Sequence, residues 1–285
     1  MNPVALVLTI ISTIFFGTVT VYATKVSRKV GAVPALFLYQ ALGIPLFLLF
    51  VPIMPQMPTH FSAGPTLLLG ALSTFAFILF YYSTTIGELP VVGTVNQLYL
   101  VVTTILGIWL LHEPFAALKI LGFILVFIGI VLFSFKLTGR EKKNIKLLRG
   151  VPHSFLSAVG IGVYLYFVAI FSRTNGWFLT ALLIRVAISV TALIVMVIQR
   201  QNIVSILKQT PWKDAIMAAA LDVIAFSLYN FVVGRYEFTS ATIISATKCV
   251  ITVVLANKLL GEHLTKRQII GFCIILAGLI SLQLK

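Results

Sequence analysis

Long uninterrupted apolar runs constrain the fold of this chain more than any other feature of its sequence. Runs of about 18 or more residues recur along its 285 residues, and each is long enough to cross the roughly 30 Å hydrocarbon layer of a membrane as a helix. Only helices and closed barrels satisfy their backbone hydrogen bonds in lipid, and runs of this length exclude barrel strands. The composition agrees, since 10% of the residues are charged against about 25% in soluble domains. The sequence therefore predicts an all-α integral membrane protein.

Ten membrane spans fit the sequence, and most of the connections between them are short. The expected spans cover residues 3–23, 31–52, 63–85, 89–111, 117–135, 152–172, 177–198, 211–235, 238–259 and 265–283. The first run lacks the basic beginning and the small-residue cleavage site of a signal peptide, so we interpret it as a retained span. Pro90 suits the first turn of the fourth span. Thr265 and Gln268 have the spacing of a capping box at the start of the tenth span.

The second half of the sequence repeats the first at an offset of 149 residues. Residues 110–113 (Leu-Leu-His-Glu) return as residues 259–262 (Leu-Leu-Gly-Glu). A self-match that runs without a gap over four apolar segments indicates an internal repeat rather than chance. Four glycines keep this register, and we expect them to allow close helix packing: Gly122 with Gly271, and Gly129 with Gly278.

The number of spans in each repeat determines how the two halves are related. Residues 1–135 and 151–285 each hold five expected spans, so the second copy must enter the membrane from the opposite side to the first. The basic linker between them, residues 136–150, is expected to be a solvated loop on the membrane surface. Inverted repeats are typical of secondary transporters that bind substrate near the midplane. The sequence thus predicts ten transmembrane helices in two inverted five-helix repeats.

This arrangement resembles the drug/metabolite transporter superfamily, and in particular its EamA-type members. The resemblance rests on ten spans in two five-span repeats, each ending its fourth span in Leu-Leu-x-Glu before a glycine-bearing helix. It implies that Glu113 and Glu262 mark the ends of the fourth and ninth spans. Residues 261–265 follow the usual form of the family, whereas residues 112–116 (His-Glu-Pro-Phe-Ala) depart from it. The superfamily moves amino acids, sugars, nucleotide sugars, cations and drugs, so the resemblance does not name a substrate.

Three charged residues lie well inside the expected spans: Arg185, Asp222 and Lys248. Each costs about 2.5–3.5 kcal/mol to insert at a helix centre, so together they imply mutual pairing or a water-filled cavity. All three fall within about two residues of a span midpoint, which at 1.5 Å rise per residue places them in one thin slab. Arg185 and Asp222 form either a structural ion pair or a pair that also lines a cavity. Lys248 is expected to contact substrate, unless burial leaves it without its proton, because one acid cannot neutralise two bases.

Helical spacing groups further side chains with these charges. The group on the eighth span comprises Asp222, Phe226, Tyr229 and Asn230, and the group on the ninth comprises Ser245, Lys248 and Thr252. In the first copy the repeat aligns Tyr99 with Lys248 and, at a shifted offset of 145 residues, Gln40 with Arg185. The first copy is therefore polar but uncharged where the second is charged. The predicted substrate-binding residues are Lys248, Arg185, Asp222, Asn230, Tyr229, Asn96, Tyr99 and Gln40.

The charges of the predicted site favour some substrates and exclude others. One acid among two bases suits a small anion, or a zwitterion whose carboxylate meets a base and whose amine meets Asp222. Bulky lipophilic cations fit less well. Both cysteines lie in apolar runs and all four histidines lie in loops or at span ends, so we expect neither a metal, nor a cofactor, nor an enzyme. The net charge of +14 comes mainly from connections between spans, so membrane lipids are expected partners and nucleic acid is not.

Two functions and two orientations remain open at this point. The first function is a secondary transporter of the cell membrane, an exporter or exchanger that moves a small polar metabolite by alternating access, and it is compatible with a monomer. The alternative is a lipid-handling or flippase-type membrane protein. Odd-numbered connections hold 15 Lys and Arg residues and the opposite side holds four, so the positive-inside rule places both termini outside. Members of the superfamily usually keep both termini inside.

Overall fold

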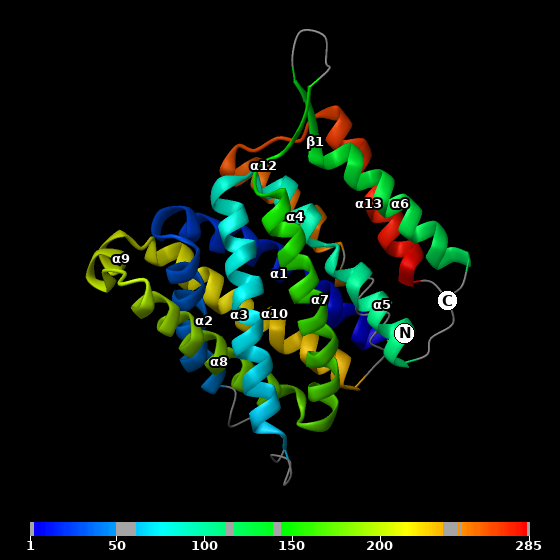
Figure 1. Cartoon of the computed structure of the whole chain (residues 1–285). Helices are drawn as coiled ribbons and strands as arrows, with labels where there is room; N and C mark the ends of the chain where they lie inside the picture. The colour runs from blue at the N-terminus through cyan, green and yellow to red at the C-terminus, as the bar shows by residue number, and fades with distance from the viewer. Residues whose placement is uncertain are drawn as a thin grey trace.

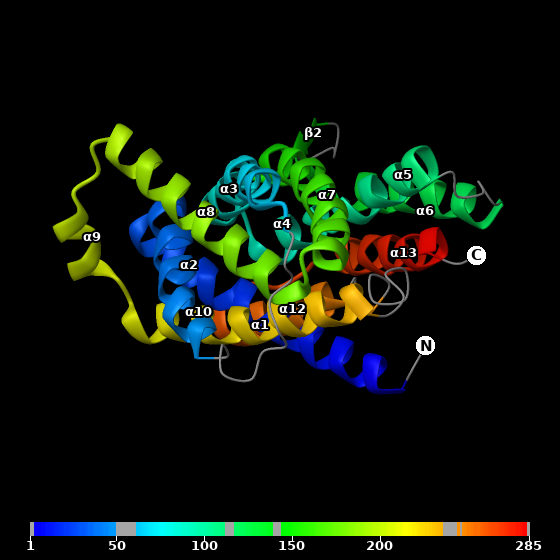
Figure 2. The same cartoon turned by 90° about the horizontal axis from the view of Figure 1, so that it is seen from below.

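The computed structural model describes residues 3–49, 61–111, 117–138, 144–235, 244–245 and 247–283, which form a bundle of helices with a small β-hairpin (Figures 1 and 2). The first half contains α1 (Pro3–Val30), α2 (Ala32–Leu48), α3 (Ala63–Ile86), α4 (Leu89–Asn96), α5 (Tyr99–Leu111), α6 (Ala117–Ser134) and β1 (Phe135–Thr138). After it come β2 (Asn144–Leu147), α7 (Val151–Thr174), α8 (Trp177–Ile198), α9 (Ile203–Gln209), α10 (Trp212–Arg235), α12 (Lys248–Leu260) and α13 (Lys266–Gln283).

Six segments within the described residues are long and apolar enough to cross a membrane, and the segment over residues 89–110 includes a helix break. They are Pro3–Val30, Ala63–Ile86, Leu89–Leu110, Val151–Thr174, Trp177–Ile198 and Trp212–Arg235. Shorter apolar helices cover Ala32–Leu48 and Ile120–Ile130. A helical bundle with membrane-spanning segments is therefore confirmed, whereas the count of ten spans stays a prediction.

Threonine hydroxyls inside the first helix find their partners within the helix itself. In α1 the hydroxyl of Thr9 donates to the carbonyl oxygen of Ala5 at 2.6 Å, and that of Thr13 donates to Thr9 at 2.7 Å. Bonds of this kind satisfy a polar group where no water is present. The threonines of α1 are thus compatible with a helix that spans a membrane.

Connections along the chain gather at two opposite ends of the bundle. Where α1 ends, Nη2 of Arg28 donates a hydrogen bond to the carbonyl oxygen of Gly87, between α3 and α4, at 3.1 Å. At the other end, the backbone N–H of Ser62 before α3 donates to Oδ1 of Asn175, between α7 and α8, at 3.0 Å. We call these two ends the Gly87 face and the Asn175 face.

Two glycines form the turns from which α2 and α8 begin. Gly31 has φ 94° and Gly176 has φ 78°, in the left-handed region that residues with a side chain rarely adopt. Aligning these two residues gives the offset of 145 residues. The same local geometry at both turns supports that alignment for the first helices of each half.

The predicted fourth span, residues 89–111, is two helices rather than one. α4 ends at Asn96 and α5 begins at Tyr99. Between them the backbone N–H groups of Gln97 and Leu98 bond to carbonyl oxygens three residues earlier, each at 3.0 Å. Such i to i+3 bonds tighten the backbone and interrupt the α-helix. The run of residues 89–110 is apolar on average, and it was therefore predicted as one span although the polar residues Asn96 and Gln97 lie at the break.

The equivalent position of the second half shows the same bonding. The N–H of Thr247 donates to the carbonyl oxygen of Ile244 at 3.0 Å, and α12 begins directly afterwards, at Lys248. Lys248 is the residue that the repeat aligns with Tyr99, the first residue of α5. A helix therefore starts at the same repeat position in both halves.

The linker between the halves contains a β-hairpin, and the prediction of a loop was wrong for its strands. β1 and β2 pair antiparallel, with Leu137 opposite Ile145. Residues 135–138 (Phe-Lys-Leu-Thr) and 144–147 (Asn-Ile-Lys-Leu) alternate apolar and polar residues, which is the pattern of a strand. The loop was expected from the basic charge of the linker, which says nothing about strand pairing. The fold is thus helical apart from this hairpin.

α6 and α13 lie side by side at one edge of the bundle (Figures 1 and 2). A Cβ atom at Gly129 would lie 2.9 Å from the carbonyl oxygen of Gly271, and one at Gly278 would lie 2.9 Å from that of Gly122. Each helix therefore places a glycine against the backbone of the other. The predicted role of these four glycines in close helix packing is confirmed.

Both predicted helix starts are also confirmed. Pro90 lies in the first turn of α4, where its missing N–H costs no hydrogen bond. Before α13, the N–H of Gln268 donates to Oγ1 of Thr265 at 3.3 Å, and the N–H of Thr265 donates to Oε1 of Gln268 at 2.8 Å. These two reciprocal bonds are those of a capping box.

Candidate functional site

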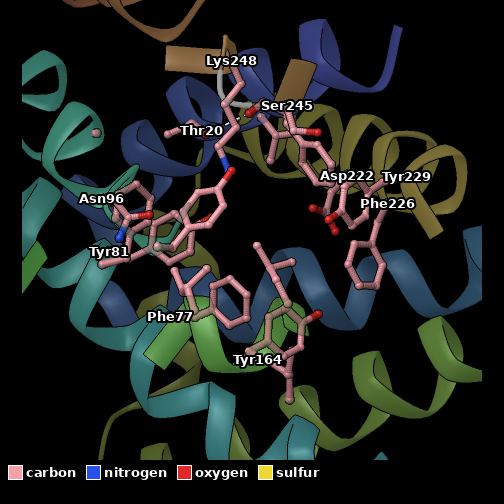
Figure 3. A pocket seen from close by; sticks show the side chains of 18 of the residues that line it. Thr20, Phe77, Tyr81, Asn96, Tyr164, Asp222, Phe226, Tyr229, Ser245 and Lys248 are labelled. Carbon is pink, nitrogen blue, oxygen red and sulfur yellow. Dashed lines mark hydrogen bonds between the residues drawn. The ribbon is translucent and has the colours of Figure 1, made fainter. Parts of the chain in front are cut away.

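A cavity lies among helices of both halves of the chain, namely α1, α2, α3, α4, α5, α7, α8, α10 and α12 (Figure 3). The space inside it that no atom occupies is about 1050 Å³, including the solvent at its mouth. Twenty-four residues of both halves line it, and three of them, Arg185, Asp222 and Lys248, are charged. The cavity is therefore a solvent-connected space with charged groups inside the bundle.

Seven of the eight predicted substrate-binding residues line this cavity: Lys248, Arg185, Asp222, Tyr229, Asn96, Tyr99 and Gln40. The eighth, Asn230, does not line it. Asn230 is fully buried and its Oδ1 accepts a hydrogen bond from the hydroxyl of Ser172 at 3.2 Å. One residue along a helix corresponds to a rotation of about 100°, which turns Asn230 away from the wall that carries Tyr229. Asn230 was predicted to line the cavity because the sector of the helix assigned to the cavity face was too wide.

The lining residues fall largely into pairs that the repeat relates. At the offset of 145 residues the pairs are Phe16 with Ile161, Val19 with Tyr164, Thr20 with Leu165, Tyr39 with Ile184, and Gln40 with Arg185. At the offset of 149 residues they are Phe77 with Phe226, Phe80 with Tyr229, Asn96 with Ser245, and Tyr99 with Lys248. Equivalent positions of the two copies thus form one cavity wall.

The aromatic part of this wall was largely missed by sequence reasoning. The additional rings are Phe16, Tyr39, Phe77, Phe80, Tyr81 and Tyr164. Neighbouring rings hold one another edge to face, with centroids 5.6 Å apart for Tyr39 and Tyr81 and 5.3 Å apart for Phe77 and Tyr164. The signal that would have found Phe77 is the repeat, which aligns it with Phe226 beside Asp222.

Arg185 and Asp222 form a buried ion pair between α8 and α10, from Nη2 to Oδ2. Gly43 of α2 makes room for it, because a Cβ atom there would overlap Nη1 of Arg185 and come 2.9 Å from its Cζ. The side chain of Arg185 is 2% exposed and that of Asp222 is 13% exposed. The predicted ion pair is therefore present, and its carboxylate is the more accessible partner.

Lys248 reaches into the cavity and lies against aromatic rings rather than a carboxylate (Figure 3). Its Nζ is 4.6 Å from the ring centroid of Tyr99 and 5.7 Å from that of Phe16. A desolvated cation over such rings gains about 2 kcal/mol, which is less than a paired counter-ion would supply. Within the described part of the chain, no Asp or Glu forms an ion pair with Lys248.

Figure 3 shows how the labelled groups are distributed around the cavity. Lys248 enters from one side, Asp222 and Tyr229 occupy a second, and Phe77 and Tyr164 occupy a third. A solute inside would therefore meet a cation, an anion and apolar ring faces at once. Among the described residues no three His, Cys, Asp or Glu side chains gather to hold a metal ion.

Comparison with known proteins identifies the family. The sequence model of the EamA-like transporter family matches residues 3–135 and, a second time, residues 148–283. The chain belongs to the EamA-like transporter family. The resemblance to the drug/metabolite transporter superfamily is thereby confirmed, and this family is one of integral membrane transporters rather than enzymes.

The fold is also found among solved structures. A crystal structure with 15% sequence identity is similar over 99% of this EamA-like chain and 96% of its own, with a TM-score of 0.62. At that identity the likeness concerns the fold alone. No curated protein sequence matches the chain.

The family's glutamate lies where the resemblance implied in the second half of this EamA-like transporter. α12 ends at Leu260, Gly261 turns the chain with φ 69°, and Glu262 follows. Its Oε1 lies 2.7 Å from Nη1 of Arg28 in the first half. The equivalent Glu113 falls outside the described residues. Glu262 thus marks the end of a helix, as expected, and also contacts the other half of the chain.

Proposed function

We propose that this EamA-like protein is a secondary transporter, an exporter or exchanger, that moves a small amino-acid-like or anionic solute by alternating access between its two halves. The observation that carries the proposal is Lys248. Its ammonium group points into a cavity formed by repeat-related residues, and no carboxylate of the described chain pairs with it. A cation that has no counter-ion among the described residues can bind the carboxylate of a solute.

The rest of the wall favours a zwitterion with an apolar body. The carboxylate of Asp222 is more exposed than the guanidinium that holds it, so an ammonium group of the solute can contact its free oxygen. Phe77, Phe226 and Tyr164 offer ring faces to the remainder of the solute. Orientation by a few polar groups within an apolar lining is the usual arrangement of a small-molecule site.

The helix breaks fit the same mechanism. α5 begins at Tyr99 and α12 begins at Lys248, two residues that the repeat aligns and that contact each other across the cavity wall. Transporters place interrupted helices at the substrate site, where irregular backbone lines a cavity. The contact between Tyr99 and Lys248 joins the two halves at the place where a solute would bind to both of them.

The test is uptake of labelled solutes by liposomes that hold the purified protein. A panel of zwitterionic, anionic and cationic amino acids and of aromatic carboxylates should show saturable uptake of one zwitterion or anion. A parallel assay with fluorescent lipids covers the alternative of a lipid-handling protein. Lipid translocation without uptake of any solute in the panel would overturn the proposal.

Within that assay, Lys248→Ala should reduce uptake at low solute concentration by at least about tenfold, because a charge-assisted hydrogen bond to the carboxylate is lost. The matched control is Lys258→Ala, which removes an exposed lysine from the same helix and should leave uptake unchanged. Size-exclusion chromatography checks that both variants fold. Undiminished uptake by a folded Lys248→Ala protein would remove this residue from the site.

A further inference from the structure

A network of bonds joins the two halves at the Gly87 face. Nη1 of Arg28 lies 2.7 Å from Oε1 of Glu262, and Oε2 of Glu262 accepts a hydrogen bond from the N–H of Leu89 at 2.7 Å. Arg28 also donates from Nε to the carbonyl oxygen of Thr84 at 2.9 Å and from Nη2 to that of Gly87 at 3.1 Å. The ends of α1 and α3 and the start of α4 are thus tied to the segment after α12.

This network lies close to the cavity. Leu89 begins α4 and Gly93 lines the cavity, so at 1.5 Å per residue the bond to Glu262 is about one helical turn from the wall. The carboxylate also lies at the start of α4, where an acidic group interacts favourably with the helix dipole. Separation of the halves at the Gly87 face must therefore break these bonds.

The repeat places an equivalent arginine at the opposite face. Arg173, at the end of α7, aligns with Arg28 at the offset of 145 residues. Its Nε points to the carbonyl oxygen of Val233 at 3.5 Å, and Val233 aligns with Thr84 at the offset of 149 residues. The same arginine-to-carbonyl contact thus recurs at the Asn175 face in a longer form. The two arginines are aligned at one offset and the two carbonyl groups at another, so the two alignments are independent of each other.

We propose that Arg28 and Glu262 form a latch that holds the cavity closed toward the Gly87 face, and that Arg173 holds the equivalent position at the Asn175 face. The inference rests on the proposed function, since only an alternating-access transporter has to open both faces. The side chains of Arg28 and Glu262 are 29% and 15% exposed. Partly exposed ion pairs contribute modestly to stability, so this latch can open and close without unfolding the helices that it joins.

The test measures how fast a cavity residue is reached from each face. Thr20 of α1 lines the cavity and is replaced by cysteine in a background in which Cys249 and Cys273 are replaced by serine. A charged, membrane-impermeant methanethiosulfonate is applied to vesicles of either orientation. A separate Gln209→Cys marker, exposed between α8 and α10, reports which vesicles present the Gly87 face.

Glu262→Gln should accelerate modification of the cavity cysteine from the Gly87 face by about tenfold, the shift expected for loss of one charge-assisted bond. Exchange of the pair, Arg28→Glu with Glu262→Arg, should restore slow modification. The matched control Glu88→Gln removes an exposed carboxylate beside Leu89 and should change nothing. Arg173→Gln should accelerate modification from the Asn175 face instead. Unchanged rates from the Gly87 face in Glu262→Gln would overturn the latch.

A second arm replaces the ion pair by a covalent bridge. Cysteines at Arg28 and Glu262 are bridged with a bifunctional methanethiosulfonate, and the bridge is cleaved by reduction. Bridging should stop solute uptake, and reduction should restore it; uptake that continues in the bridged protein would overturn the latch. If the parent protein, with Arg28 and Glu262 in place, transports no solute, the proposed function fails, while the modification rates still decide whether the pair closes this face.

Discussion

Arg185 illustrates how a single charged side chain is accommodated inside the bundle. One of its nitrogens pairs with Asp222, and Gly43 leaves the space that its guanidinium fills. Within the described structure its Nε and Nη1 have no hydrogen-bond partner. The carboxylate therefore supplies nearly all of its compensation, so the two residues should behave as one unit.

We predict that Arg185→Met and Asp222→Asn each destabilise the protein by about 3–5 kcal/mol, because each strands a buried charge, and that the double variant costs less than the sum. Apparent melting temperatures in one detergent provide the measurement. Lys213→Met, at an exposed position near the start of α10, is the control and should melt like the parent. Additive losses in the double variant would mean that the two residues act independently.

The limits of sequence prediction at this scale follow from chemistry. Arg185, Asp222 and Lys248 could be found because a charge in a membrane span is costly enough to be rare. Phe16 and Tyr164 could not, because aromatic residues serve equally well against lipid, in helix packing and on a cavity wall. Asn230 was misplaced because a polar residue inside a span can bond to a neighbouring helix, as its Oδ1 does to the hydroxyl of Ser172.

Among the helices, α6 and α13 approach each other closely at the glycines that the repeat aligns. A Cβ atom at Gly278 would lie 2.7 Å from the backbone nitrogen of Val126, and a backbone atom cannot move aside as a flexible side chain can. Gly64, near the start of α3, has nothing within 4 Å of its own Cβ position. The two glycines therefore give a matched pair for testing helix contact.

Gly278→Ala should lower stability by about 1–3 kcal/mol through overpacking. Gly64→Ala should be neutral or raise stability by up to about 1 kcal/mol, since alanine is the better helix former. Melting temperatures of the two variants, purified side by side, give the comparison. Equal melting behaviour would show that α6 and α13 separate readily enough to accept the extra methyl group.

Helix interruptions were harder to predict than helix contacts. A glycine has no side chain to hold a neighbouring helix away, and the repeated glycine spacing correctly predicted that α6 and α13 pack closely. The breaks before Tyr99 and Lys248 arise from backbone bonds to residues three positions earlier, and the polar residue Asn96 beside the first break was interpreted as a binding residue instead. The strands of residues 135–138 and 144–147 did carry a signal in the sequence, the alternation of apolar and polar residues. The linker was predicted to be a loop because of its basic charge.

For the whole molecule, the structure shows which connections share a face. Val30 at the end of α1 and Ile206 of α9 pack against the same buried cluster, and Arg28 of the same helix end bonds to Gly87 and Glu262. The connections after α1, α3, α8 and α12 therefore lie together at the Gly87 face. These belong to the odd-numbered set, in which the sequence concentrates 15 basic residues against four on the other side.

We predict that the Gly87 face is cytoplasmic and that both termini lie outside, because a nearly fourfold bias of Lys and Arg in short connections sets the orientation. The test introduces single cysteines at Ser62, exposed at the Asn175 face, and at Gln209, exposed at the Gly87 face, in a background without Cys249 and Cys273. An impermeant thiol reagent added to intact cells should label Ser62→Cys alone, and permeabilised cells should label both. Labelling of Gln209→Cys alone in intact cells would establish the orientation usual for the superfamily. Inward opening would then occur at the Asn175 face, with the residues of the cavity unchanged.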